Sequence, residues 1–143
     1  MTPLVVDASV VVKWFVPEEH SEAARSLLQL SDHAFFAPDH LFAELGNTVW
    51  KKVRRGELDA ALAPALVADM ARVAIDPVST QVLMADAYAI AARVGLTFYD
   101  GLYVALAKRL GAPLVTADRK MVDVLRRRAE PAVDVRWIGR ASF

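Results

Sequence analysis

No cysteine occurs among the 143 residues of this chain. That absence excludes a disulfide framework and a metal site built on thiolates, and it fits a reducing compartment such as the cytoplasm. A basic leader is missing too, and the charged residues Asp7 and Lys13 interrupt the apolar stretch near the N-terminus. We therefore expect a soluble protein with neither a signal peptide nor a membrane-spanning helix.

Excess charge of one sign is also absent, because 17 Lys and Arg residues balance 17 Asp and Glu residues. This balance argues against tight, non-specific binding to nucleic acid. Basic residues nevertheless gather in short groups at 51–55, 108–109, 119–120 and 126–128. We interpret these groups as helix ends, where positive charge opposes the negative end of the helix dipole. The alternative is a rim that binds phosphate.

Apolar residues, by contrast, are abundant: they make up 55% of the chain, and the mean hydropathy is +0.29. A chain of this length is expected to form one domain, spanning residues 1–143, around a single core. A domain of this size does not easily bury so much apolar surface, so we also expect an interface with a partner protein.

Short apolar segments alternate with helical patterns along the whole sequence. We predict strands at residues 4–6, 34–37, 74–78, 113–116 and 133–138. We predict helices at residues 9–16, 21–30, 39–55, 58–73, 80–94, 100–110 and 118–128. Such alternation is typical of a three-layer α/β/α domain with a parallel sheet and right-handed crossovers.

Details of several helices follow from single residues. Ser9 and Asp39 are expected to cap the first and third helices, and Pro64 is expected to interrupt the fourth. The helix over residues 80–94 is apolar around most of its circumference, so we expect it to be covered on several sides.

Asp7 directly follows a run of Leu and Val that predicts a strand buried on both faces. The carboxyl edge of an open α/β sheet is where ligands collect, so chemistry is one explanation of this carboxylate. The alternative is a helix cap. Asp118 follows Leu114 and Val115 in the same way, which predicts two carboxylates at one edge of the sheet.

Two further acids have unusual settings. Glu44 lies within a predicted helix and shares its face with Asn47 and Thr48, although plain solvent exposure would also explain it. Asp100 stands between Tyr99 and Gly101 at a predicted helix start, where a cap would be ordinary.

Taken together, four segments resemble the four motifs of PIN-domain ribonucleases, and most closely those of VapC toxins from type II toxin-antitoxin pairs. They are Asp7-Ala8-Ser9, Glu44-Leu45-Gly46-Asn47, Tyr99-Asp100-Gly101-Leu102-Tyr103 and Thr116-Ala117-Asp118-Arg119. Their order matches, and the resemblance covers essentially the whole chain. It implies strand order 3-2-1-4-5. Gly101 stands where alanine is common, which bears only on the rigidity of that helix start.

The resemblance also implies a site and partners. The acidic site maps onto Asp7, Glu44, Asp100 and Asp118, with Ser9, Asn47 and Thr116 in supporting roles. The products would carry a 3′-hydroxyl and a 5′-phosphate, and Arg119 and Lys120 are the basic residues expected to touch RNA phosphate. VapC-like proteins form homodimers and are held inactive by an antitoxin in a helical groove, for which we consider the stripe Leu62, Leu66 and Met70.

The chemistry expected of such a site follows from its residue types. Carboxylates that share a pocket repel one another, and a hard divalent cation relieves the repulsion. Ligands made only of oxygen suit Mg²⁺ or Mn²⁺ rather than Zn²⁺. We expect Asp7, Asp100 and Asp118 to hold the ion directly or through water, and Glu44 to hold the ion or orient the attacking water.

Two other functions are compatible with parts of this pattern. An aspartyl-phosphate phosphatase of the haloacid dehalogenase type also carries a carboxylate after its first strand, but a second Asp is usual where this chain has Ser9. A non-catalytic binding module would use the acids only for structure.

His20, His33 and His40 lack the spacing of a metal pair and are expected at the surface or at helix caps. Core packing is expected for Trp14, Tyr99 and Tyr103 rather than base stacking.

Overall fold

A single parallel sheet forms the centre of the molecule. The computed structural model describes residues 1–128 and 133–140. Its strands are β1 (Thr2–Val6), β2 (His33–Pro38), β3 (Asp76–Val78), β4 (Leu114–Thr116) and β5 (Val135–Trp137). They pair in the order β3-β2-β1-β4-β5, and every pairing is parallel. The predicted parallel sheet and its order are thus confirmed, with the third strand at an edge.

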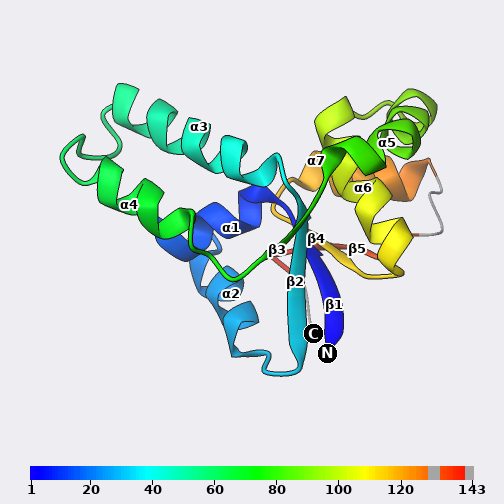
Figure 1. Cartoon of the computed structure of the whole chain (residues 1–143), viewed down its shortest axis with the longest axis horizontal. Helices are drawn as coiled ribbons and strands as arrows, with labels where there is room; N and C mark the ends of the chain where they lie inside the picture. Colours follow the sequence, from blue (N-terminus) through cyan, green and yellow to red (C-terminus); the bar gives the residue numbers. More distant parts are fainter. Residues whose placement is uncertain (129–132, 141–143) are drawn as a thin grey trace.

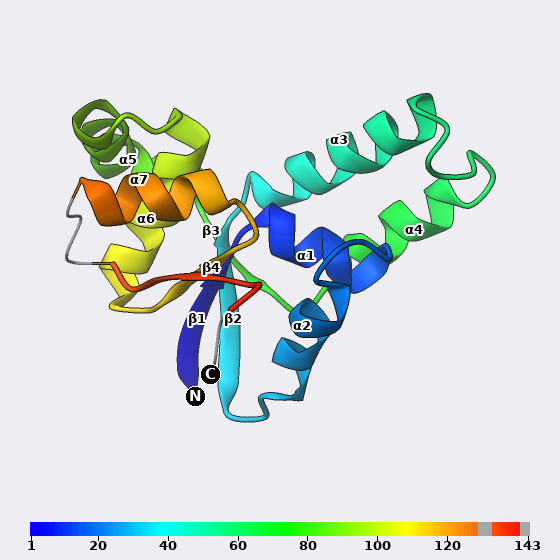
Figure 2. The same cartoon turned by 180° about the vertical axis from the view of Figure 1, so that it is seen from behind.

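Helices cover both faces of this sheet (Figure 1). One layer contains α1 (Ala8–Phe15), α2 (Ser21–Ser26) with a short 3₁₀ turn η1 (Leu27–Gln29), α3 (Leu41–Arg54) and α4 (Ala63–Met70). The other contains α5 (Thr80–Val94), α6 (Phe98–Leu110) and α7 (Arg119–Arg127), as the reverse view also shows (Figure 2). The strand order reverses beside β1, so right-handed crossovers put the first helices on one face and the later helices on the other. This reversal leaves the carboxyl ends of β1 and β4 between the two layers.

The strands nearest the centre are fully buried, as an uninterrupted run of Leu and Val predicts. Leu4, Val5 and Val6 expose at most 1% of their surface, and Leu114 and Val115 expose none. A rigid, dry pair of strands therefore carries the residues that follow β1 and β4.

Several helix ends differ from the predictions. Pro64 does not interrupt α4 but lies in its first turn, where a missing N–H costs nothing. Asp7, not Ser9, caps α1. Asp39 does not cap α3, because its Oδ1 accepts a hydrogen bond from the Thr80 backbone N–H at 3.0 Å. The helix α6 begins at Phe98 with Thr97 as its cap, so Asp100 lies within the first turn.

The helix α5 is less covered than predicted. Val82, Met84 and Tyr88 are 54%, 52% and 69% exposed, so one apolar side of α5 faces outward. The buried side packs on α6 at close range: a Cβ added to Gly101 would lie 2.6 Å from the Ala87 carbonyl oxygen. Glycine at this position therefore allows the two helices to pack closely.

Helix length and hydrophobicity bear on the expected absence of a membrane span. Within residues 1–128 and 133–140, no single helix is long and apolar enough to cross a bilayer; α5 and α6 meet those criteria only as a pair, across a bend of 113°.

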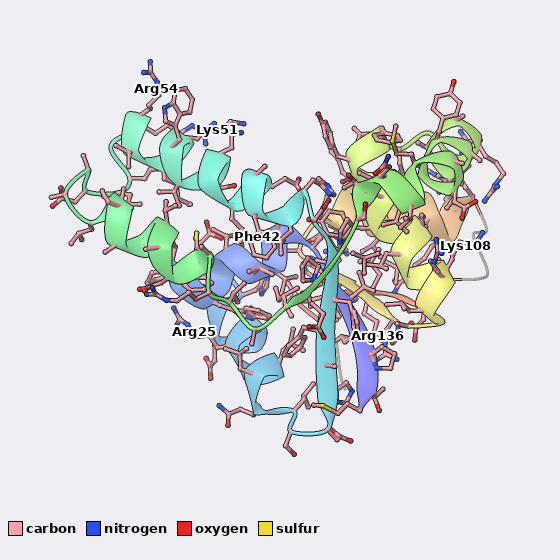
Figure 3. The ribbon with its side chains drawn as sticks, in the orientation of Figure 1. Arg25, Phe42, Lys51, Arg54, Lys108 and Arg136 are labelled. Carbon is pink, nitrogen blue, oxygen red and sulfur yellow. The ribbon has the colours of Figure 1, made fainter. Side chains whose placement is uncertain are left out.

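The basic group at residues 51–55 is a helix end, as predicted. Lys51 and Arg54 point away from the body at the outer end of α3 (Figure 3). Lys52 differs, because its Nζ lies 2.6 Å from Glu18 Oε2, while Lys13 approaches the other carboxylate oxygen at 3.3 Å. Glu18 therefore joins α3 to α1.

Candidate active site

Asp7 lies where β1 ends and α1 begins, and it is 6% exposed. Its backbone is extended, and its Oδ1 accepts hydrogen bonds from the N–H groups of Ser9 at 3.0 Å and Val10 at 3.4 Å. Asp7 therefore caps α1, as the alternative explanation predicted, and it also stands at the carboxyl edge of the sheet, where the chemical explanation placed it.

Two hydroxyl groups connect Asp7 to the end of β4. Ser9 Oγ donates to Asp7 Oδ1 and accepts from the Ala117 N–H at 2.9 Å. Thr116 Oγ1 donates to Asp7 Oδ2 at 2.5 Å and accepts from the Asp118 N–H at 3.0 Å. Both oxygens of Asp7 are thus fixed, and the same hydroxyls fix the backbone that carries Asp118. Asp118 in turn caps α7 through the Met121 N–H at 3.2 Å.

Electrostatic interactions connect Asp7, Glu44, Asp100 and Asp118, which we call the acidic cluster. Burial raises the pKa of Asp7 to about 6, against hydrogen bonds that lower it, and the charges of Asp100 and Glu44 raise it further. The pKa of Asp100 is also raised, first by burial and then by Asp118 and Glu44. These side chains come from both helix layers and from two strand ends, and their charges act on one another.

Glu44 is held from the opposite layer of the molecule. The Tyr103 hydroxyl on α6 donates to Glu44 Oε1 at 2.6 Å, and His40 Nε2 lies 3.1 Å from the same oxygen. Burial and the carboxylates of Glu44 and Asp7 raise the pKa of Tyr103, so its hydroxyl keeps the proton that it donates. Glu44 is therefore oriented by the far side of the site.

Three aromatic residues that the sequence predicted only at the surface, at a helix cap or in the core lie beside this site: His40, Tyr99 and Tyr103. The ring of His40 stacks on Tyr99 with centroids 5.7 Å apart and lies 5.0 Å from Tyr103, so it belongs to the site rather than to the open surface. Tyr99 is 62% exposed, so the prediction of core packing is wrong for it, whereas Tyr103 is 1% exposed. Helical spacing contained the signal: His40 precedes Glu44 by four residues, and Tyr103 follows Asp100 by three.

The supporting residues divide into two sets. Ser9 and Thr116 bind Asp7 directly, as described above. Asn47 lies with Glu44, His40, Ala43 and Tyr99 around a cleft of about 390 Å³. Arg119 is turned elsewhere, since its guanidinium carbon lies 4.7 Å from the centre of the Trp137 ring.

The donor atoms of the acidic cluster bear on which metal could bind. They are carboxylate and hydroxyl oxygens, which suit Mg²⁺ or Mn²⁺. Among the residues that the structure describes, no three Asp, Glu, His or Cys side chains stand close enough to hold a metal by themselves. The donor set therefore fits a hydrated ion, held through few direct ligands and several waters, rather than a preformed cage.

Comparison with known proteins supplies the family. A sequence profile of the PIN domain matches residues 4–127. The chain belongs to the PIN-domain family. Ribonuclease VapC3 of Pyrobaculum aerophilum is 35% identical to this PIN domain over 122 residues, which cover 84% of the chain and 92% of the relative. This match makes the chain a VapC-type PIN domain and is evidence against the phosphatase alternative.

Solved structures share the fold of this PIN domain. Mycobacterium tuberculosis VapC20, described as a sarcin-ricin loop cleaving toxin, superimposes with a TM-score of 0.67 at 17% identity, over 93% of this chain and 98% of that one. VapBC2 of Rickettsia felis, bound to a DNA fragment from its promoter, gives a TM-score of 0.64 at 15% identity over 94% and 98%.

Proposed function

We propose that this PIN domain is a metal-dependent endoribonuclease and the toxin of a toxin-antitoxin pair. The observation that carries the proposal is the acidic cluster, in which burial and neighbouring negative charge raise the pKa of Asp7. Four acids that repel one another at the edge of a sheet are costly unless a cation joins them. The 35% identity to a protein named as a ribonuclease supports RNA as the substrate.

In this mechanism Asp7, Asp100 and Asp118 would hold a hydrated Mg²⁺ or Mn²⁺, directly or through water. When bound, the ion would lower the pKa of a water molecule and stabilise charge on the attacked phosphodiester. Glu44, to which the Tyr103 hydroxyl donates a hydrogen bond, would position the attacking water. Water attacks phosphorus and the 3′-oxygen leaves, which gives a 3′-hydroxyl and a 5′-phosphate. Ser9 and Thr116 keep both oxygens of Asp7 in place throughout.

Incubation of the purified protein with cellular RNA and Mn²⁺ tests this proposal, with new 5′ ends mapped by sequencing. We expect cleavage that EDTA abolishes and that Asp7→Asn abolishes. Asp69→Asn is the matched control, because Asp69 is an exposed acid on α4 that pairs with Arg72. Cleavage that survives both EDTA and Asp7→Asn would contradict the proposal.

The antitoxin surface that we propose differs from the stripe expected from sequence. Met70 is 2% exposed and belongs to the core, so it is unavailable to a partner. Leu62 and Val67 on the same helical hairpin are 61% and 41% exposed. An amphipathic antitoxin helix that packs on these side chains would remove apolar surface from water. Leu62→Glu with Val67→Glu should abolish co-purification with the antitoxin, and retained binding would locate the contact elsewhere.

A homodimer in the cytoplasm completes the proposal. The exposed side chains Val82, Met84 and Tyr88 of α5 are the apolar surface that a second copy would cover. Light scattering should give the mass of a dimer for the native chain and of a monomer for Met84→Glu with Tyr88→Glu. A dimer that persists in this variant would exclude α5 as the interface.

A further inference from the structure

A second cavity, of about 400 Å³, lies between α7 and the edge strand β5. We call it the arginine pocket, because Arg119, Arg126, Arg136 and Arg140 line it together with Trp137. Arg119 and Arg126 are separated by seven residues and therefore lie on the same face of α7. The proposed hydrolysis uses none of these side chains.

Among the residues that the structure describes, the charges in the arginine pocket do not cancel. The two acids among its described lining residues are Asp123 and Asp134, and Arg136 binds Asp134, with nitrogen to oxygen distances of 2.7 and 3.2 Å. Arg119, Arg126 and Arg140 are all exposed, and Asp123 is the other described carboxylate of the lining. The described lining therefore carries more positive than negative charge, in a chain whose formal net charge is zero.

Trp137 is held in a defined position in this pocket. The Arg119 guanidinium lies over its ring at 4.7 Å, and the His20 ring meets it nearly edge-on at 5.3 Å. A Cβ added to Gly139 would lie 2.6 Å from Trp137 Cη2, so glycine there leaves room for the indole. The Arg119 guanidinium and the Trp137 indole therefore lie one over the other. RNA-binding proteins stack bases on surfaces of both kinds.

The arginine pocket adjoins the acidic cluster. Trp137 pairs with Thr116 across the β4 and β5 strands, and Thr116 binds Asp7. Arg119 follows Asp118 directly, at the start of α7. A strand of RNA lying over the acidic cluster would therefore pass the pocket beside the scissile bond.

We propose that the arginine pocket binds the nucleotide next to the scissile phosphate, with its base on the stack of Arg119 and Trp137 and its phosphate on Arg126 and Arg140. This inference rests on the proposed ribonuclease function. Guanidinium groups match phosphate in charge and geometry, and stacking on a ring tolerates any base. An acidic peptide would satisfy the arginines but would leave the stack unused, so a nucleotide fits the whole pocket better.

Binding can be measured without cleavage. The native protein in EDTA is titrated into a short fluorescein-labelled single-stranded RNA, followed by anisotropy at several salt concentrations. Arg126→Gln with Arg140→Gln should weaken binding and reduce the slope of log affinity against log salt by about 0.7 for each phosphate that no longer meets a guanidinium. Trp137→Leu should weaken binding about tenfold and leave the slope unchanged, because stacking releases no counterions.

The chain offers a matched control. Arg54 stacks on Trp50 at 4.9 Å, and Figure 3 shows Arg54 pointing away from the molecule at the far end of α3. Arg54→Gln and Trp50→Leu should leave affinity within about twofold of the native protein, a difference below the worth of one stacked base. Equal losses at both pairs would show general attraction of RNA to surface arginine and would overturn the proposal.

Two further probes separate the outcomes. Inorganic polyphosphate lacks bases, so Trp137→Leu should not affect its binding; an equal loss would contradict base stacking. A poly-glutamate peptide that binds the pocket more tightly than RNA does would assign it to an acidic protein segment instead.

Cleavage assays on the same variants distinguish the two proposals. If the native protein cleaves RNA while the variants bind normally, only the pocket is wrong. If it cleaves nothing while the variants lose binding, only the nuclease function is wrong.

Discussion

The two halves of the acidic cluster are held in different ways. Asp7 lies in a dry position at the end of β1, where two hydroxyls and two backbone N–H groups fix both of its oxygens. Glu44 and Asp100 come from α3 and α6, on opposite faces of the sheet, and both are partly exposed. The first half depends on local hydrogen bonds near the sheet. The second depends on how the two helix layers are placed, with the bond from Tyr103 to Glu44 linking them.

The site therefore has one rigid part at the strand ends and one part whose position depends on helix packing. The strand ends determine where Asp7 and Asp118 lie, because β1 and β4 are neighbours in the sheet. Helix packing determines where Glu44 and Asp100 lie relative to them. A change in α6 should therefore affect activity without disturbing the surroundings of Asp7.

Replacement of a single acid of the acidic cluster should reduce RNA cleavage more than any of the other changes below. Asp7→Asn and Asp100→Asn should each lower the rate of RNA cleavage by about 1,000-fold, or about 4 kcal/mol, because each removes one of the carboxylates that we propose as metal ligands. Single-turnover cleavage at saturating Mn²⁺ measures the loss. If only Asp7→Asn lowered the cleavage rate, the acids at the strand ends would suffice for the reaction and Asp100 would have no part in it.

Gly101→Ala should lower the free energy of unfolding by about 3 kcal/mol, because its Cβ would meet the Ala87 carbonyl and force α5 from α6. Urea denaturation measures the change. Gly46→Ala is the matched control, since nothing lies within 4 Å of its added Cβ, and it should gain up to about 1 kcal/mol. In the Gly101→Ala variant, the rate of RNA cleavage should fall by more than the loss of stability explains, because Gly101 adjoins Asp100. Unchanged cleavage in the folded variant would show that the position of α6 does not matter.

The raised pKa of Asp7 makes stability depend on pH. Its ordinary pKa is 3.8 and its folded pKa is about 6, so the folded chain resists ionisation of this group. The metal-free protein should lose about 2 kcal/mol as the pH rises from 4 to above 6. In EDTA, Asp7→Asn should be the more stable form at pH 8 and not at pH 4, measured by thermal unfolding. Lower stability of Asp7→Asn throughout would favour a purely structural role, as in a non-catalytic binding module.

Tyr103→Phe should have the smallest effect, about 1 kcal/mol in stability and a several-fold loss of cleavage, because Glu44 loses one donor but keeps its place on α3. Tyr99→Phe provides the comparison, since Tyr99 is 62% exposed. Equal behaviour of the two variants would mean that the bond between the layers does not orient Glu44.

The sheet could be predicted from sequence because its signal is local. Runs such as Leu4 to Val6 mark buried strands without any knowledge of their partners, and the four motifs then implied the strand order. Helix starts were less predictable. Asp39 has the chemistry of a cap, but the backbone N–H of Thr80, distant in sequence, takes its carboxylate. Which backbone N–H binds Asp39 is decided by the fold, because Thr80 comes close to Asp39 only in the folded chain.

The neighbourhood of the acids was harder to predict for the same reason. The roles expected of Ser9 and Thr116 came from resemblance, and the structure adds the hydrogen bonds that hold them. Tyr103 lies near Glu44 only because the fold brings α6 to α3, whereas His40 is four residues before Glu44 in the sequence. The arginine pocket is lined by residues of α7 and β5. No sequence pattern predicts that the Trp137 ring lies beneath the Arg119 guanidinium.

The capping roles of Asp7 and Asp118 have a practical consequence. Asparagine begins helices as well as aspartate does, whereas alanine does not. A chain that carries both Asp7→Asn and Asp118→Asn should therefore keep α1 and α7 intact while it loses the proposed RNA cleavage. This variant could be expressed in living cells and crosslinked to the RNA that it binds, and sequencing that RNA would test the proposed function on natural substrates.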